Sequence, residues 1–260
     1  MGLPAVLSRW LWIGLAGFVH LSIAAVSADA ERPHVVMLVA EREYRTDESL
    51  SDFSEQHRDR YRTTMVQADP DDRNRLVGLD ALDSADVLIV SVRRRTLPAA
   101  QLDTIRRYVA SGKPVIGIRT ASHAFSLRNA EPDDGRAMWP EFDSQVFGGH
   151  YTNHHGNALK ATIDLADTIP PQANGLVEGL SDGLPTEAGG SLYRVSPVND
   201  RATVLLRGKV EGHPEEPIAW TFVRDDGGKS FYTSLGHVDD FKGPVLPKLL
   251  TNAIDWSLEK

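Results

Sequence analysis

The side chains best suited to proton transfer occur in short polar segments of this chain. Histidines stand at His123, His154 and His237, and the histidine side chain can act as a base at neutral pH. Arg119 lies four positions before His123 and can hold a negatively charged oxygen as a fixed cation. A base and a fixed cation are what abstraction of a proton beside a carbonyl group requires, so we predict these residues to be catalytic.

Two acidic pairs add candidate general acids or bases, Glu41 with Glu43 and Asp239 with Asp240. The same pattern is typical of loop charges and of the first turns of helices, where carboxylates interact favourably with free N–H groups. Both interpretations stay open. Glu43 and Asp239 are the members that we expect to contact a ligand.

The segment 148–156 contains three histidines, which raises the question of a metal site. His150 and His154 are four positions apart, a spacing that would place both on one face of a helix. Glycines at 148, 149 and 156 make a helix there doubtful, and no glutamate lies within the segment to serve as a base. We therefore expect no metal and no cofactor, with His150 and His155 in the wall of a polar pocket. A metal-dependent hydrolase that uses His150, His154 and His155 is an alternative.

The chain has no cysteine. Thiol nucleophiles, thiolate metal sites, redox motifs and disulfides are therefore excluded. Ser122 and His123 are adjacent, but a nucleophile and its base are normally brought together by folding and not by sequence. The chain also lacks the G-x-S-x-G elbow, which disfavours serine catalysis.

The elements that must position these residues alternate between strands and helices in the first half. His34–Ala40 and Asp86–Val92 are near-continuous apolar runs, typical of strands buried on both faces. The other elements predicted here are a helix over 50–57 capped by Asp47 or Ser49, a strand over 61–67, a helix from Pro98 to Gly112, and a strand over 114–119. Strand, helix and strand at this spacing indicate right-handed crossovers in a parallel sheet.

The second half is predicted to contain strands joined by short turns and a closing helix. The predicted strands are 158–166, 191–195, 202–208, 218–224 and 229–235, with a hairpin turn at 225–228 and a helix over 244–258. The fold class is therefore α/β, a doubly wound and mostly parallel sheet with an antiparallel C-terminal hairpin extension. Because ligands bind beyond the carboxyl ends of parallel strands, we expect Arg119, His123, His154 and His237 to line one pocket.

The amino terminus is typical of an export signal. Arg9 precedes an uncharged stretch from Trp10 to Val26, and small residues follow up to Ala30. This order predicts a signal peptide over 1–30, cleaved after Ala30 or Ala28, and one domain over 31–260 that is periplasmic or extracellular. A membrane anchor is the other interpretation, but glycine, histidine and serine dilute the apolar run.

The net charge of −8 excludes the basic footprint of a nucleic-acid or anionic-lipid partner. The run Arg93–Arg95 is the basic cluster, and three charges are more typical of a solvated loop than of a binding patch. No membrane contact is expected once the signal is removed. A homodimer remains open.

Several segments resemble the ThuA-like (trehalose utilisation) proteins. The resemblance rests on VMLVAEREYRTDESL, PVIGIRTASHAF, MWPEFDSQVFGGHYTNHHG, SFYTSLGHVDDF and the final TNAIDW, and it covers about His34 to Trp256. It implies a fold similar to class I glutamine amidotransferases, with a sharp turn after one central strand, and a role in disaccharide catabolism through 3-keto sugars. In the amidotransferases that turn carries a cysteine, whereas Arg119 stands there in this chain, so glutamine hydrolysis is excluded. Many ThuA-like proteins have a histidine about there, and His123 could reach the same space.

The sequence thus predicts an exported carbohydrate-processing protein that acts on 3-keto-glycosides or related disaccharides by acid–base chemistry. Its partner would be a small-molecule carbohydrate. The alternative from another class is a sugar-binding protein without activity, in which Tyr44, Trp139 and Tyr151 would serve as stacking platforms.

Overall fold

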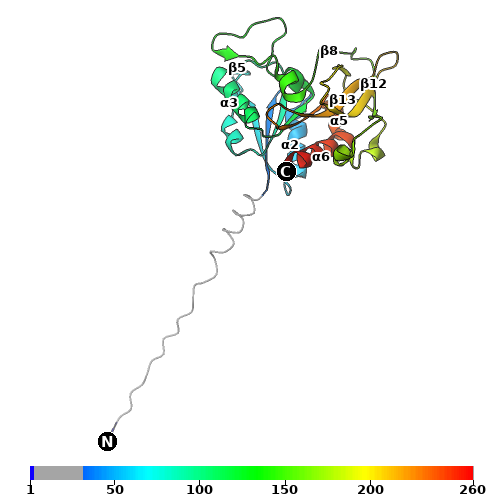
Figure 1. Cartoon of the computed structure of the whole chain (residues 1–260). Coiled ribbons are helices and arrows are strands. Elements are labelled where there is room, and N and C mark those ends of the chain that lie inside the picture. The colour runs from blue at the N-terminus through cyan, green and yellow to red at the C-terminus, as the bar shows by residue number, and fades with distance from the viewer. Residues whose placement is uncertain (3–31, 260) are drawn as a thin grey trace. The chain divides into compact units, whose positions relative to one another are not determined.

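A ten-stranded sheet forms the centre of the computed structural model, which describes residues 1–2 and 32–259 (Figure 1). Its parallel part consists of neighbouring strands in the order β14 (Lys229–Thr233), β6 (Val115–Ile118), β4 (Val87–Val92), β1 (His34–Ala40) and β2 (Arg62–Ala68). The predicted mostly parallel α/β sheet is therefore confirmed. Of the predicted signal peptide over 1–30, residues 3–30 lie outside the described residues.

Antiparallel strands extend the sheet at both edges. Next to β14 come β13 (Glu216–Val223), β12 (Thr203–Lys209), β9 (Thr162–Leu165) and β10 (Thr186–Glu187), and the short β3 (Leu76–Val77) lies beside β2. The turn Asp225–Gly228 joins β13 to β14 as the predicted hairpin. β14 is thus the strand where the two parts of the sheet meet, since it is antiparallel to β13 and parallel to β6.

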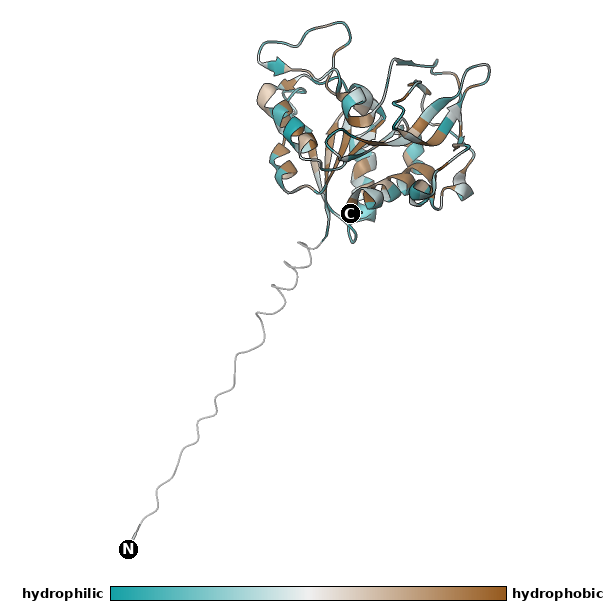
Figure 2. Ribbon diagram, viewed as in Figure 1, coloured by the Kyte–Doolittle hydropathy of each residue, from teal (hydrophilic) through white to brown (hydrophobic). Residues whose placement is uncertain are grey.

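Helices cover both faces of the parallel strands because alternate residues of each strand point to opposite faces. Val35 and Met37 of β1 pack in the same core cluster as residues of α2 (Thr46–Gln56) and α6 (Val245–Leu258). Val36 and Leu38 belong to the core cluster that contains the apolar residues of α3 (Ala99–Ala110). Figure 1 shows α3 on one side of the strands and α2 and α6 on the other, and Figure 2 shows apolar residues concentrated in the strands between them.

Several elements differ from the expectations. α2 begins at Thr46 and is preceded by Arg45 in the left-handed conformation (φ 53°), so neither Asp47 nor Ser49 caps it. The segment predicted as a strand over 191–195 is β11 (Tyr193–Arg194), which pairs with β8 (Asn153–His154) outside the main sheet. The other short elements are β5 (Leu97–Pro98), β7 (Arg136–Ala137), α4 (Asn174–Val177), α5 (Val238–Lys242), and the 3-10 turns η1 (Leu79–Ser84), η4 (Pro171–Ala173) and η5 (Ser181–Gly183).

A sharp turn follows β6, as the resemblance implied. Arg119 has a φ of 42°, and residues Arg119–His123 form the 3-10 turn η2. A positive φ is strained for a residue with a side chain and persists where surrounding contacts hold it. A second unusual turn, the π-helical segment η3 (Asp143–Phe147), lies further along the chain. These two turns supply the side chains that matter below.

Within Pro33–Lys260, which forms one compact unit, the helices are short relative to a bilayer. No helix within the described residues has both the length and the apolar character that a membrane span requires.

Candidate functional site

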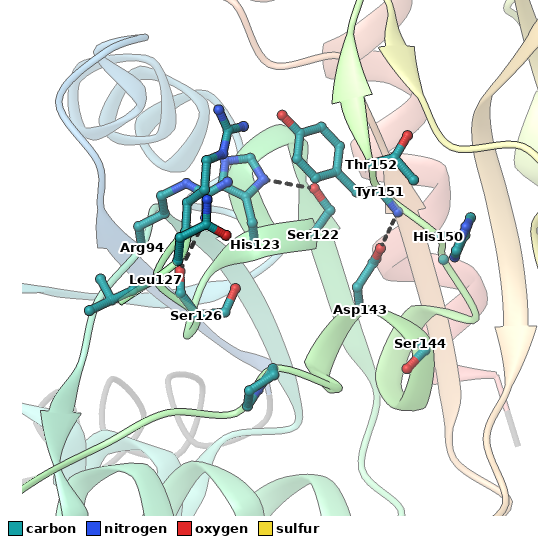
Figure 3. Close-up of a pocket in the computed structure, with 14 residues that line it drawn as sticks. Arg94, Ser122, His123, Ser126, Leu127, Asp143, Ser144, His150, Tyr151 and Thr152 are labelled. Atoms are coloured by element: carbon teal, nitrogen blue, oxygen red, sulfur yellow. Dashed lines mark hydrogen bonds between the residues drawn. The ribbon is translucent and has the colours of Figure 1, made fainter. Parts of the chain in front are cut away.

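A cavity of about 380 Å³ opens beyond the carboxyl ends of β4 and β6. We call it the His123 cavity; its wall includes Arg94, Ser122, His123, Asp143 and Tyr151. Figure 3 shows Arg94 and His123 on one side and Asp143 on the other. Arg94 follows β4, and Ser122 and His123 belong to the turn η2 after β6. The position agrees with the rule that ligands of open parallel sheets bind at the strand ends.

His123 is 7% exposed and electrically neutral over the physiological pH range. Burial first, and then repulsion from the neighbouring arginines, Arg94 foremost, lowers the pKa of its imidazole to about 2. Its Nδ1 lies 3.1 Å from the Ser122 hydroxyl oxygen, and that hydroxyl donates to the Arg119 carbonyl oxygen at 3.3 Å. With the hydroxyl proton directed to that carbonyl, His123 Nδ1 carries the hydrogen and Nε2 keeps a lone pair. In this tautomer His123 is a hydrogen-bond acceptor at Nε2.

Asp143 is a buried carboxyl group at the cavity wall. It is 8% exposed, and burial raises its pKa to about 7, although the hydrogen bond from the Tyr151 backbone N–H opposes this shift. That N–H donates to Oδ2 at 2.8 Å. The other oxygen, Oδ1, has no hydrogen-bond partner among the described residues. A carboxyl group that titrates near neutral pH in a cavity is suited to act as both acid and base.

Two arginines add positive charge to the same cavity, Arg94 and Arg128. Arg94 is half-buried with a φ of 50°, and its Nη1 donates to the Ser126 carbonyl oxygen at 3.4 Å. Burial, followed by repulsion from Arg128, lowers the pKa of Arg94. The ring of Tyr151 stacks on that of His123 with a centroid separation of 4.6 Å. The cavity thus offers cations, a neutral imidazole, a carboxyl group and an aromatic face.

Arg119 lies at the same sheet edge but does not line this cavity. It is 3% exposed, and its guanidinium lies between the rings of Tyr44 and Tyr193 at 4.4 and 4.6 Å. Nη1 donates to the Ser234 carbonyl oxygen at 2.8 Å and Nη2 to that of Ser191 at 3.3 Å. Nε has no hydrogen-bond partner among residues 32–259. Two of the three guanidinium nitrogens of Arg119 therefore donate hydrogen bonds within the protein.

No carboxylate neutralises Arg119 at ion-pair distance among the described residues, and Glu41 and Glu43 act elsewhere. Glu41 accepts hydrogen bonds from the backbone N–H groups of Glu43, Tyr44 and Thr46 and from the Thr46 hydroxyl. The exposed Glu43 forms an ion pair with Arg93 at 2.8 Å. Carbonyl oxygens and aromatic faces, and not an acid, hold the buried Arg119 cation.

His237 lies at the sheet edge of Arg119 and acts as the N-cap of α5. Its Nδ1 accepts from the backbone N–H of Asp239 at 3.2 Å, and the Asp240 carboxylate accepts from the His237 N–H at 2.9 Å. The His237 ring meets the edge of Tyr44 at 5.9 Å. An aromatic series therefore connects His237 to Arg119 through Tyr44, and Arg119 to His123 through Tyr193.

The histidines of segment 148–156 do not converge. His150 is exposed and lines the His123 cavity, whereas His154 is exposed on β8 with Nδ1 donating to the His155 carbonyl at 2.7 Å. His155 is buried against His213 at 4.7 Å. In the described part of the chain, no group of three or more metal-ligating side chains could hold a metal ion. His154 belongs to β8 and His150 lies in the irregular segment before it, so the four-residue spacing does not place them on one helix face.

The remaining predicted contacts lie away from the cavity. Trp139 packs on Phe142, and its indole N–H donates to Gln145 Oε1 at 2.8 Å. The exposed Asp239 accepts from Lys242 at 2.7 Å. Of the predicted substrate-binding residues, His150 and Tyr151 line the His123 cavity.

Sequence reasoning missed Asp143, Arg94 and Arg128 as members of the site. Asp143 stands in the segment MWPEFDSQVFGGHY that carries the resemblance, but among acidic neighbours it reads as an exposed helical residue. The close approach of Gly149, where a Cβ would lie 2.2 Å from Asp143 Oδ1, is visible only in the folded structure.

Comparison with known proteins identifies the family of this chain. The sequence matches the ThuA family, described as trehalose utilisation, over residues 29–257. No curated protein matches it. A solved ThuA-like protein from Bacteroides uniformis is 17% identical, with 88% of this chain and 94% of that chain covered and a TM-score of 0.60. Another, from Parabacteroides merdae, is 13% identical, with 88% and 90% covered and a TM-score of 0.58. These two structures share the fold. The chain therefore belongs to the ThuA family, which supports a carbohydrate-related function.

Proposed function

We propose that this protein is an exported enzyme that processes a 3-keto-glycoside or a related disaccharide derivative by proton transfer in the His123 cavity. The observation that carries the proposal is Asp143, a buried carboxyl group at the cavity wall whose pKa is raised to about 7 by burial. Catalytic acids and bases work best when their pKa lies near the working pH. The description of the family, trehalose utilisation, supports a disaccharide-related substrate.

The chemistry follows from the acidity of the C–H bond beside a keto group. In a 3-keto-glycoside, the ionised Asp143 would take the proton from C2, and the electron pair of that bond would form an enolate on the C3 oxygen. As the C3 carbonyl re-forms, the electron pair makes a double bond between C1 and C2, and the glycosidic C1–O bond breaks. The departing oxygen takes back the proton from Asp143. Atoms and charge balance, and Asp143 returns to its ionised form.

The other residues of the cavity have roles that suit this sequence. Arg94 and Arg128 provide positive charge that would stabilise the developing enolate oxygen. Electrostatic stabilisation of this kind is usually the largest contribution to catalysis. The His123 imidazole does not take up a second proton near neutral pH, so its Nε2 would accept a hydrogen bond from a sugar hydroxyl and orient the sugar ring. Arg119 is a positioning residue in this proposal, since its backbone carbonyl holds Ser122 and its side chain is buried.

A sugar-binding protein without activity is the second candidate, and the Tyr151 ring at the cavity wall is the observation that favours it. Tyr44 and Trp139, the other two predicted stacking platforms, are used on Arg119 and on Arg106. Binding would therefore rest on one aromatic face. Turnover of a 3-keto-disaccharide distinguishes the two candidates.

The test is Asp143→Asn, which keeps the size of the side chain and removes the titrating group. We expect turnover of a 3-keto-disaccharide to fall at least about 100-fold, the usual range for loss of a general acid–base group. Glu141→Gln is the matched control, because Glu141 is an exposed carboxylate two positions away and should leave turnover unchanged. Full activity in Asp143→Asn would refute the mechanism. Saturable binding of the sugar by the unaltered protein with no turnover would leave the binding candidate.

A further inference from the structure

A second cavity of about 380 Å³ lies beside β1 and β4, and the mechanism above does not use it. We call it the Arg95 cavity; it is lined by Arg42, Arg73, Arg93, Arg95, Glu41 and Glu43. Four arginines gather there although the whole chain carries a net charge of −8. Four cations this close together repel one another, so another interaction must compensate for their repulsion.

The backbone explains how the arginine run reaches both cavities. The N–H groups of Arg93, Arg94 and Arg95 donate in turn to the carbonyl oxygens of Ala40, His123 and Ala124. These bonds fix the backbone, which bends at Arg94, where φ is 50°. Arg94 lines the His123 cavity, while Arg93 and Arg95 line the Arg95 cavity.

Arg95 is the unusual member of this group. It is 5% exposed, its Nε is fully buried, and the described residues give its guanidinium neither a hydrogen bond nor an ion pair. Burial first, and then repulsion from Arg73, Arg42 and Arg93, lowers its pKa to about 10. A buried cation without a partner is costly, so it normally marks a place where a ligand supplies the missing acceptors.

The acids of the cavity do not supply those acceptors. Both oxygens of Glu41 accept hydrogen bonds from residues 43–46, and Glu43 is paired with Arg93. With four arginines and two glutamates the cavity has a net charge of about +2, which matches a doubly charged anion. Guanidinium forks on several sides also match a group with three or more acceptor oxygens.

We propose that the Arg95 cavity binds a doubly charged tetrahedral oxyanion, a phosphate or sulfate group, either free or carried by a small organic molecule. Arg95 forms the buried floor of this site, and Arg42, Arg73 and Arg93 close it from the solvent side. The volume is at the lower end of that of small-molecule pockets, so it accommodates the anion with a few attached atoms. The proposal does not depend on the reaction assigned to the His123 cavity.

Calorimetric titration of the full chain with inorganic phosphate, at constant ionic strength in chloride buffer, tests the site. We expect saturable binding of one phosphate per chain. Arg95→Met should weaken it at least about tenfold, because a charge-assisted hydrogen bond is lost. Arg73→Gln, a change at an exposed position, should also weaken binding and serves if Arg95→Met does not fold. Arg75→Gln is the matched control, since Arg75 belongs to the same loop but pairs with Asp69 and does not line the cavity.

The free protein offers an independent readout. In phosphate-free buffer Arg95→Met should melt no earlier than the unaltered chain, because an unpaired buried cation is removed. A concentration of about 10 mM phosphate is well above the Kd of a weak millimolar site. Absence of saturable heat up to that concentration would overturn the proposal. Binding that is unchanged in both Arg95→Met and Arg73→Gln would overturn it as well. A hexose phosphate that binds more tightly than inorganic phosphate would identify an organic ligand, and equal affinity would identify the free anion.

Discussion

The raised pKa of Asp143 makes a quantitative prediction about stability. The carboxyl group has a pKa of 3.8 in the unfolded chain and about 7 in the folded protein, because it is buried. Between these values the folded protein binds more protons than the unfolded chain, so its stability falls as the pH rises. The stabilisation of the protonated form is complete below pH 3.8 and is lost as the pH passes 7.

The magnitude follows from the shift of about three pKa units. At roughly 1.4 kcal/mol per unit, ionisation of Asp143 lowers the free energy of unfolding by about 4 kcal/mol between pH 4 and pH 8. This is a large fraction of the 5–15 kcal/mol that stabilises a typical domain. Asp143→Asn cannot ionise, so its stability relative to the unaltered protein should rise by about the same amount over this range.

Urea unfolding from pH 4 to pH 8.5 of the unaltered chain, Asp143→Asn and Glu141→Gln measures this difference. The other titrating groups are common to all three proteins and largely cancel in the difference between curves. We expect the Asp143→Asn difference curve to rise and then level off above pH 7, and the Glu141→Gln curve to show no such rise. A flat curve for Asp143→Asn would refute the burial argument, and with it the acid–base role.

Three further changes probe the neighbourhood of Arg119 and Glu41. Arg119→Lys cannot reach both the Ser234 and Ser191 carbonyls, so urea unfolding should show a loss of about 2 kcal/mol; unchanged stability would contradict the structural role. Gly190→Ala places a Cβ 2.5 Å from Arg119 Nη2 and should cost about 1–3 kcal/mol, whereas Gly175→Ala, with open space around it, should cost nothing. Equal melting temperatures for the two alanine variants would argue against a tightly packed Arg119. Glu41→Ala removes the acceptor of four hydrogen bonds and should lower the melting temperature by several degrees, equivalent to about 2 kcal/mol; calorimetry that finds no change would show that the loop holds itself.

The sequence predicts the parallel strands well because their signal is local. β1 spans His34–Ala40, the predicted bounds, since an uninterrupted apolar run needs burial on both faces. The cap of α2 was missed because Arg45 takes a left-handed conformation that no composition rule favours for arginine. The strand predicted over 191–195 is the shorter β11, and its pairing with β8 was not predicted because a two-residue strand gives no periodic signal.

The candidate site was predictable only in part. The strand-end rule predicted that Arg119, His123, His154 and His237 line one pocket, and of these four residues His123 lines the His123 cavity. His150 and Tyr151, predicted as substrate contacts, line it as well. The rule could not separate Arg119 from that cavity, because the separation depends on two tyrosine rings that cover the guanidinium. Nor could it identify Asp143 or Arg95, since their importance comes from burial without a full set of partners, which is a property of the folded state.

The place of β14 in the sheet has a consequence for how the protein acquires its site. Arg119 and Ser234 are 115 positions apart, yet their hydrogen bond joins the ends of two paired parallel strands. The turn that carries His123 therefore has its neighbouring strand only after nearly the whole chain has emerged from the ribosome. Contacts between residues this distant in sequence form slowly. Until they form, the edge of β6 that faces β14 has no partner strand. Such an edge can pair with other chains, and addition of the last 30 or so residues, which include β14, is the step that completes the sheet.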